Sequence, residues 1–99
     1  MNADRMQPDS QLPNEEQRRK LCDMLHHALV EIRMLAGSGN SKQASDLADA
    51  FHNLPHEIWC DYFSISFFRE SFLLPYLRKW PTGHTYDYLA MLDEVEKLG

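Results

Sequence analysis

The stretch Ile58–Trp80, IWCDYFSISFFRESFLLPYLRKW, decides the fold of this 99-residue chain. It holds eight of the eleven aromatic residues, and each such side chain can bury roughly 150–250 Å². Apolar residues do not alternate with polar ones here or elsewhere, and β-branched residues are scarce, so no strand is expected. The stretch therefore predicts an all-α protein whose core is built around one aromatic helix.

On a helical wheel, this segment has an apolar arc of roughly 200°, about twice what a helix needs to face one core. Two interpretations follow. Either the helix lies at the centre of a small bundle, or part of its arc faces another protein or a second copy of the chain. For the second case we expect Trp59, Phe63 and Phe67 on the outer side. Phe68, alone on the polar flank, is a further candidate for partner binding.

The first helix is predicted over residues 14–37. Asn14 and Gln17 have the spacing of a capping box, and the glycines at 37 and 39 stop the helix. Its apolar stripe consists of Leu21, Leu25, Ala28, Leu29, Ile32, Leu35 and Ala36.

Three more helices are predicted over residues 41–54, 56–80 and 85–98. Pro55 ends the second helix, Pro75 kinks the third, and Thr85 caps the last. The last helix is expected to turn inward Tyr86, Leu89, Leu92, Val95 and Leu98. The short connections predict a single-domain antiparallel four-helix (up-down) bundle over residues 14–99, preceded by a mobile N-terminal arm over residues 1–13.

Charge and hydropathy narrow the function. A net charge of −5 and a pI near 5.4 argue against nucleic-acid binding and against binding to anionic membranes. No run of eighteen uncharged apolar residues and no signal peptide is present, which predicts a cytoplasmic protein. The two cysteines are expected to be reduced thiols there.

Histidine and cysteine spacing suggests a metal site only as a secondary hypothesis. Cys22 and His26 are four residues apart, as are His56 and Cys60, and such a set suits tetrahedral zinc. The tight turns that hold paired ligands in known zinc motifs are missing. We therefore expect no metal and no cofactor.

Signatures of catalysis and of DNA reading are missing as well. The chain has no Gly-x-Ser-x-Gly elbow and no glycine-rich phosphate loop, so it is not expected to be an enzyme. A helix-turn-helix over residues 40–67 would need exposed basic or amide side chains on its second helix, and aromatic residues occupy those positions.

The segment Lys42–Pro55, KQASDLADAFHNLP, preceded by Ile32–Ala36, IRMLA, resembles a segment of small uncharacterised bacterial helical proteins with the pattern IRxL…G…QAxxLADAxHNxP. The resemblance implies a bacterial source and a helical fold, and it carries no activity. Within the pattern, Arg33 is expected to pair with Asp46 or Asp49. His52 and Asn53 are expected to cap carbonyls before Pro55.

Taken together, these features predict a protein–protein interaction or accessory and regulatory module. The aromatic helix face would bind a second copy of the chain or a basic protein, since the acidic rim disfavours anionic partners. The alternative is a small-molecule or metal-binding regulatory domain that uses Cys22, His26, His56 and Cys60.

Overall fold

The computed structural model describes residues 12–60 and 63–99, and every regular element in these ranges is helical. The all-α prediction is confirmed. The elements are α1 (Glu15–Gly37), α2 (Ser41–Phe51), α3 (Asn53–Trp59), α4 (Ile65–Phe68), η2 (Arg69–Leu73), α5 (Leu74–Lys79) and α6 (Tyr88–Lys97). Most of the expected N-terminal arm, residues 1–11, lies outside the described residues, as do Asp61 and Tyr62 of the aromatic stretch.

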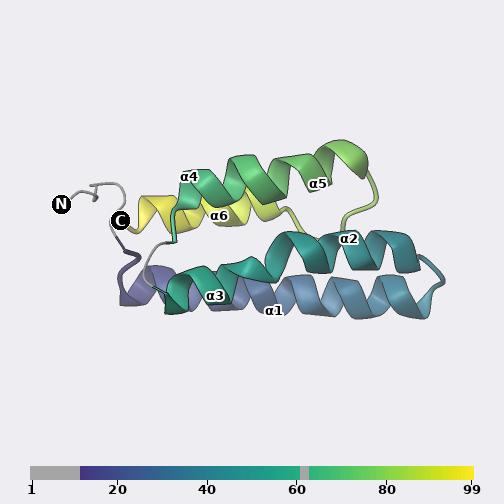
Figure 1. Ribbon diagram of the computed structural model, residues 1–99, viewed down its shortest axis with the longest axis horizontal. Coiled ribbons are helices and arrows are strands. Elements are labelled where there is room, and N and C mark those ends of the chain that lie inside the picture. Colours follow the sequence, from purple (N-terminus) through teal and green to yellow (C-terminus); the bar gives the residue numbers. More distant parts are fainter. Residues whose placement is uncertain (1–11, 61–62) are drawn as a thin grey trace.

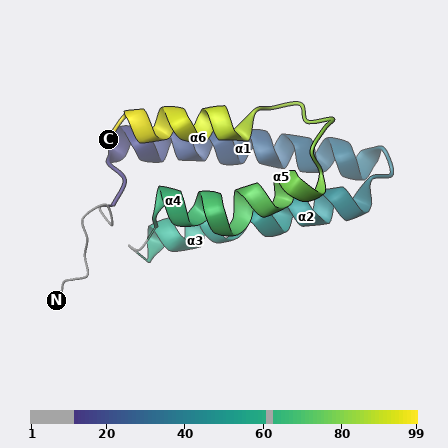
Figure 2. The same ribbon diagram turned by 90° about the horizontal axis from the view of Figure 1, so that it is seen from above.

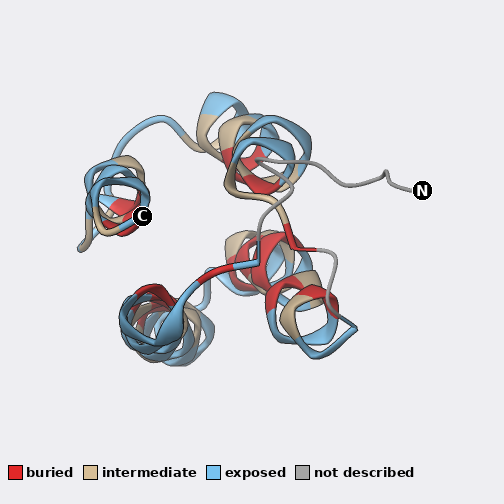
Figure 3. Ribbon diagram, turned by 90° about the vertical axis from the view of Figure 1, so that its left-hand side faces the viewer, coloured by how far each residue is buried: buried red, intermediate tan, exposed pale blue. Residues whose placement is uncertain are grey.

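The helices form two pairs that lie against each other (Figures 1 and 2). α1 runs beside α2, which α3 continues, and the continuous α4–η2–α5 segment runs beside α6. Contacts across the pairs join α1 to α6 and α2 to η2, so each segment meets two neighbours. The buried residues turn toward the space that the segments enclose (Figure 3). One core therefore joins all of the helices.

Local hydrogen bonds define both ends of α1, as the sequence predicts. The Asn14 side chain accepts from the Gln17 backbone N–H, and the Asn14 backbone N–H donates to the Gln17 side chain. At the other end, the N–H of Asn40 donates to the Leu35 carbonyl across Gly39, whose φ is 86°. This Schellman arrangement needs a residue that tolerates positive φ, which glycine supplies at no steric cost.

The N-terminus of α1 is also tied to the end of α6. The Gln17 side chain donates to the Val95 carbonyl at 3.0 Å, and the Asn14 side chain donates to the Leu98 carbonyl at 3.0 Å. Pro13, expected in the mobile arm, is buried, and its carbonyl accepts from the Arg18 guanidinium. The last residue of that expected arm is therefore packed against the helical domain.

The buried line of α1 differs from the expected stripe. Its members follow three-four spacing: Gln17, Leu21, Met24, Ala28 and Glu31. Leu29, expected to be buried, is 55% exposed. A line of this spacing is the narrow seam with which a helix meets two neighbours in a bundle.

The aromatic stretch is not one helix, and the prediction of a single helix over residues 56–80 is wrong. α3 ends at Trp59, and α4 begins at Ile65 with Ser64 as its N-cap. The Ser64 hydroxyl accepts from the Phe67 N–H at 3.3 Å, which replaces a helical bond missing at the start of α4. The wide apolar arc therefore belongs to two segments, and each of them faces the core with its own side.

Pro75 produces a local irregularity in the place where the sequence predicts one. Proline has no N–H, and its ring would collide with the carbonyl of Ser71 in a regular α-helix. The preceding turn, η2, is widened to a π-helix, in which the Leu74 N–H donates to the carbonyl of Arg69, five residues back.

α6 begins later than expected and with a different cap. The Asp87 side chain accepts from the Ala90 N–H at 3.1 Å, so Asp87 rather than Thr85 starts the helix. The buried side consists of Tyr88, Leu92 and Val95. Tyr88 therefore has the inward position that was expected for Tyr86, which is only half-buried.

Candidate functional site

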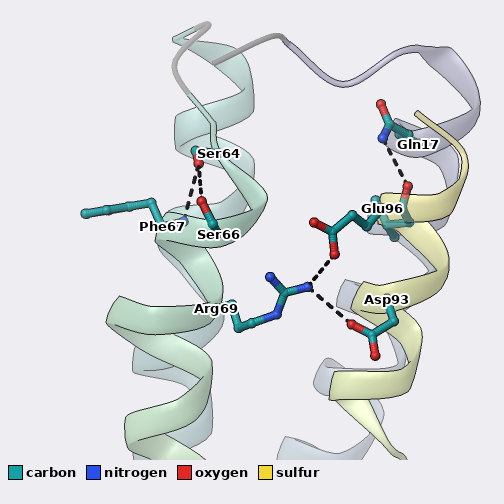
Figure 4. Close-up of polar contacts among 8 residues, drawn as sticks. Gln17, Ser64, Ser66, Phe67, Arg69, Asp93 and Glu96 are labelled. Atoms are coloured by element: carbon teal, nitrogen blue, oxygen red, sulfur yellow. Dashed lines mark hydrogen bonds and ion pairs between the residues drawn. The ribbon is translucent and has the colours of Figure 1, made fainter. Parts of the chain in front are cut away.

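Two aromatic side chains stand out at the surface. Trp59, the last residue of α3, is 85% exposed, and Phe67 in α4 is 53% exposed. Phe67 points away from α6 (Figure 4). Phe63, expected on the outer side, is 1% exposed, and Phe68, expected as a further partner-binding residue on the polar flank, is 0% exposed, so both expectations are wrong. The break in the aromatic stretch explains the error, because Phe63 lies in the link and Phe68 faces the core from a new helix.

The backbone beneath Phe67 is held on two sides. The Ser64 cap fixes the first turn of α4, and the Arg69 guanidinium bonds Asp93 at 3.2 Å and Glu96 at 2.9 Å on α6 (Figure 4). Only 18% of the Arg69 side chain is exposed, which favours an ordered guanidinium. The rings of Phe67 and Phe72 are in contact, and we call these two residues, together with the exposed Trp59 at the end of α3, the aromatic surface.

A hollow of about 240 Å³ lies between α2 and α5, next to this surface. Phe72, Pro75, Ala50 and Tyr76 supply apolar walls, and Asp46, Asp49, Ser71 and Lys79 supply polar ones. The Phe72 ring meets the Phe67 ring edge-on, with centroids 5.8 Å apart. The hollow is thus continuous with the Phe67–Phe72 part of the aromatic surface.

Asp46 binds its neighbours at one end of the hollow. Its carboxylate accepts from the Trp80 indole at 2.9 Å and pairs with Lys79 at 3.0 Å and Lys42 at 3.1 Å. The Trp80 hydrogen bond, followed by the two lysines, holds the pKa of Asp46 well below its usual range. The Asp46 hydrogen bond is in turn the main cause that raises the pKa of Lys42. These contacts join α2 to the end of α5.

A second polar cluster lies inside the protein, around Glu31 of α1. The Tyr88 hydroxyl donates to Glu31 Oε1 at 2.5 Å, and His84 Nδ1 lies 3.5 Å from Glu31 Oε2. The rings of His84 and Tyr76 pack against each other, with centroids 5.4 Å apart. Glu31 is 1% exposed, so a carboxyl group lies in the core between α1, α6 and the α5–α6 loop. We call Glu31, His84, Tyr88 and Tyr76 the buried polar cluster.

The hydrogen-bond roles in this cluster limit its chemistry. His84 Nε2 donates to the Trp80 carbonyl, which can only accept, so this nitrogen carries a hydrogen. The other ring nitrogen faces Glu31, at ion-pair distance and without hydrogen-bond geometry. Both ring nitrogens are thereby directed inside the protein. His84 also lines a hollow of about 520 Å³ at the α5–α6 loop.

Burial dominates the titration of the two tyrosines. It raises the pKa of Tyr88 above its usual range, and the Glu31 contact raises it further. Burial also raises the pKa of Tyr76, and the hydrogen bond from Gln43 at 3.1 Å partly offsets that effect. Both phenols are therefore protonated near neutral pH, Tyr88 donating to Glu31 and Tyr76 accepting from Gln43, which suits a structural role.

The sequence contains one signal for this cluster that the expected stripe overlooked. Leu21, Met24 and Ala28 follow three-four spacing, and continuing that spacing leads to Glu31. No sequence pattern distinguishes His84 from a surface histidine, although only 12% of its side chain is exposed. Tyr88 follows Asp87, whose role as N-cap sets its position on the helix.

The four residues of the metal hypothesis do not meet at one place. Cys22 and His26 are exposed on α1, whereas Cys60 Sγ lies 3.7–3.9 Å from the ring nitrogens of His56 at the end of α3. Within residues 12–60 and 63–99, no group of three or more His, Cys, Asp or Glu side chains is arranged to hold a metal ion.

Some of the roles expected for the residues of the Ile32–Pro55 pattern are found in the structure, and others are not. His52 Nδ1 lies 2.8 Å from the Asp49 carbonyl, so the expected cap at the end of α2 is present. Pro55 lies in the first turn of α3, where proline is tolerated. The expected ion pair of Arg33 with Asp46 or Asp49 does not form among the described residues, because lysines bind Asp46 instead. Asn53 is the first residue of α3 and is half-buried.

In the described part of the chain, none of the helices combines the length and the apolar character that crossing a membrane requires. Comparisons with protein families, with curated protein sequences and with solved structures find no match to this chain.

Proposed function

We propose that this chain is a protein–protein interaction module, an accessory or regulatory subunit, that binds through the aromatic surface. The exposure of Trp59 carries the proposal, because an indole that is 85% exposed gains much from burial against a partner. Tryptophan is among the residues most enriched at binding hot spots. The other exposed large apolar residues in the described ranges, Leu12, Leu29 and Met34, are not aromatic.

The proposal also includes the arrangement of the helices. An antiparallel up-and-down bundle of four helical segments would present the aromatic surface on a rigid frame. A preorganised surface loses less side-chain and backbone freedom on binding, so more of the contact energy becomes affinity. The Arg69 bridge to α6 and the Ser64 cap support such rigidity beneath Phe67.

We favour a basic protein as the partner over a second copy of the chain. The proposed location is the cytoplasm. The chain has a net charge of −5, and Glu70, three residues after Phe67, is exposed. Arg69, beside it, is bound to Asp93 and Glu96. The rim of the aromatic surface therefore favours positive charge, and two copies of an acidic chain repel each other.

The experiment uses the full chain, immobilised, as the target for a displayed library of random peptides. The variants are Trp59→Ala and Phe67→Ala, and Met34→Ala is the matched control, since Met34 is 52% exposed on α1. We expect selected peptides to bind the first two variants at least about tenfold more weakly, as loss of a hot spot implies. Binding to the control should be unchanged.

Two results would contradict the proposal. One is a selection that yields no peptide above background, and the other is a set of peptides that bind all variants equally. Sedimentation of the purified protein tests the second copy as partner. A dimer that dissociates in Trp59→Ala would keep the aromatic surface as the interface and replace the basic partner by self-association.

A further inference from the structure

The π-helical turn gives the aromatic surface its shape. In a regular α-helix, residues five apart lie about 140° apart around the axis, so Phe67 and Phe72 would point in different directions. The wider η2 turn brings them together, with ring centroids 5.8 Å apart. π-turns of this kind are frequent at functional sites. Here the turn places Phe72 both against Phe67 and in the wall of the hollow between α2 and α5.

The hollow has one apolar side and one charged side, on which Asp46, Asp49 and Lys79 lie. Phe72 and Pro75 form the apolar wall, and Ala50, 3% exposed, lies at its base. Its volume of about 240 Å³ is below the roughly 300–1,000 Å³ of drug-sized ligand sites. It therefore suits a single side chain of a macromolecule better than a small-molecule ligand.

The charge of Asp49 indicates which kind of partner residue would lie next to the side chain that enters the hollow. Asp49 is exposed at the hollow, and among the described residues it forms no ion pair. Lys79, which also lines the hollow, and Lys42, whose pKa the charge of Asp49 helps to raise, are both bonded to Asp46. Asp49 is thus a carboxylate at the edge of an apolar hollow whose local cations are already engaged.

We propose that this hollow receives a basic–apolar segment of a protein partner. One apolar side chain of that segment packs against Phe72 and Pro75, and a neighbouring arginine or lysine pairs with Asp49. The inference rests on the proposed function, since the same partner covers the aromatic surface. It adds the partner's chemistry and the place where its charge binds.

Two variants of exposed residues test the hollow without disturbing the core. Asp49→Lys reverses the charge, and Ser71→Trp fills the hollow from its rim. Glu16→Lys and Ser41→Trp are the matched controls, because both positions are exposed and lie outside the hollow. Far-UV circular dichroism and thermal melting check that every variant folds.

The probe is the same displayed library of random peptides, selected on the full-length wild-type chain. We expect the selected peptides to place arginine or lysine next to a large apolar residue. Asp49→Lys should weaken their binding by about fivefold to tenfold at low salt, and by less at high salt, because the pair is exposed. Ser71→Trp should weaken it at least about tenfold, and the two controls should leave it unchanged.

The outcomes separate the two proposals. Peptides that lose binding in Trp59→Ala but bind Asp49→Lys and Ser71→Trp like wild type would overturn the inference and leave the proposed function standing. Peptides without basic residues, or a chain dimer that Ser71→Trp dissociates, would also overturn it. Peptides insensitive to Trp59→Ala and to Ser71→Trp would overturn both.

Discussion

The buried polar cluster and the aromatic surface are both unusual, but in opposite ways: the first buries an acidic side chain, and the second exposes aromatic side chains to water. Glu31 is a carboxylate that is 1% exposed, and Trp59 is an indole that is 85% exposed. Carboxylates are rarely buried unless they are paired, and large aromatic side chains are usually packed inside. Glu31 accepts a hydrogen bond from Tyr88 and lies at ion-pair distance from His84, both within the chain. Trp59 has no comparable environment within the fold, which is why we assign recognition to the aromatic surface and stability to the cluster.

The largest expected change in stability comes from a substitution in the buried polar cluster. Glu31→Ala should lower the free energy of unfolding by about 3–5 kcal/mol, because it leaves a cavity and removes the partner of Tyr88 and His84. Urea unfolding followed by circular dichroism measures it. Glu31→Gln is the control, since its amide oxygen can still accept from Tyr88. We expect a loss below about 1 kcal/mol for Gln. Equal losses for Ala and Gln would mean that the charge itself is required.

Tyr88→Phe comes next. It keeps the ring and removes the donor to Glu31 Oε1, a hydrogen bond to an acidic group in the core. We expect a loss of about 1.5–3 kcal/mol in urea unfolding. Tyr86→Phe, on the neighbouring half-buried ring, is the control and should change stability by less than about 0.5 kcal/mol. If both variants behave alike, the Tyr88–Glu31 bond is unimportant and the contrast between the two regions weakens.

A third prediction concerns Glu57, a buried carboxyl group in α3, close along the chain to Trp59. It is 7% exposed, Oε1 has no hydrogen-bond partner in the described structure, and burial raises the pKa of Glu57. A raised pKa means that the folded chain holds this proton more tightly than the unfolded chain. The free energy of unfolding therefore falls as the pH rises above the unfolded value of about 4.3.

Glu57→Gln removes this titration. We expect the variant to be about 1 kcal/mol more stable than wild type at pH 7, and the difference to disappear near pH 4. Thermal melting across this pH range measures it, with exposed Glu70→Gln as the control. A stability difference that stays constant with pH would show that burial does not govern this carboxyl group.

The smallest expected effects on stability belong to the aromatic surface. Trp59→Ala should change the free energy of unfolding by less than about 0.5 kcal/mol, and Phe67→Ala by about 1 kcal/mol because its ring packs edge-on against Phe72, although both weaken peptide binding at least about tenfold. Urea unfolding measures the first quantity and the peptide selection the second. A loss above about 1 kcal/mol for Trp59→Ala would indicate that the indole packs within the fold. In that event the comparison between the two regions would fail.

Several parts of this structure are readable from local sequence. The Asn14–Gln17 capping box and the Gly39 turn are set by residues within a few positions of one another, and both were predicted correctly. The irregularity before Pro75 follows from one missing N–H. The break after Trp59 was missed, because a long run of apolar and aromatic residues is compatible with one helix as well as with two.

The candidate site was predictable only in part. Trp59 and Phe67 were expected at the surface and are found there, whereas Phe63 and Phe68 are buried. A wheel drawn for one helix cannot tell these pairs apart, since their directions depend on where the helix is interrupted. The hollow beside Phe72 needs α2 and α5 to lie together, and no periodicity within either segment contains that information.

The sequence by itself determined the helical class, the ends of α1 and the acidic, aromatic-rich character of the chain. These properties arise from backbone hydrogen bonds and side-chain types that act over a few residues. The tertiary structure alone decided which aromatic rings face water and which carboxyl groups, Glu31 and Glu57, are buried. Glu31 meets a tyrosine 57 positions away, and Asp46 meets Trp80 34 positions away. Contacts of that range exist only after the segments have packed, because packing determines which polar groups lose water and which partners then replace it.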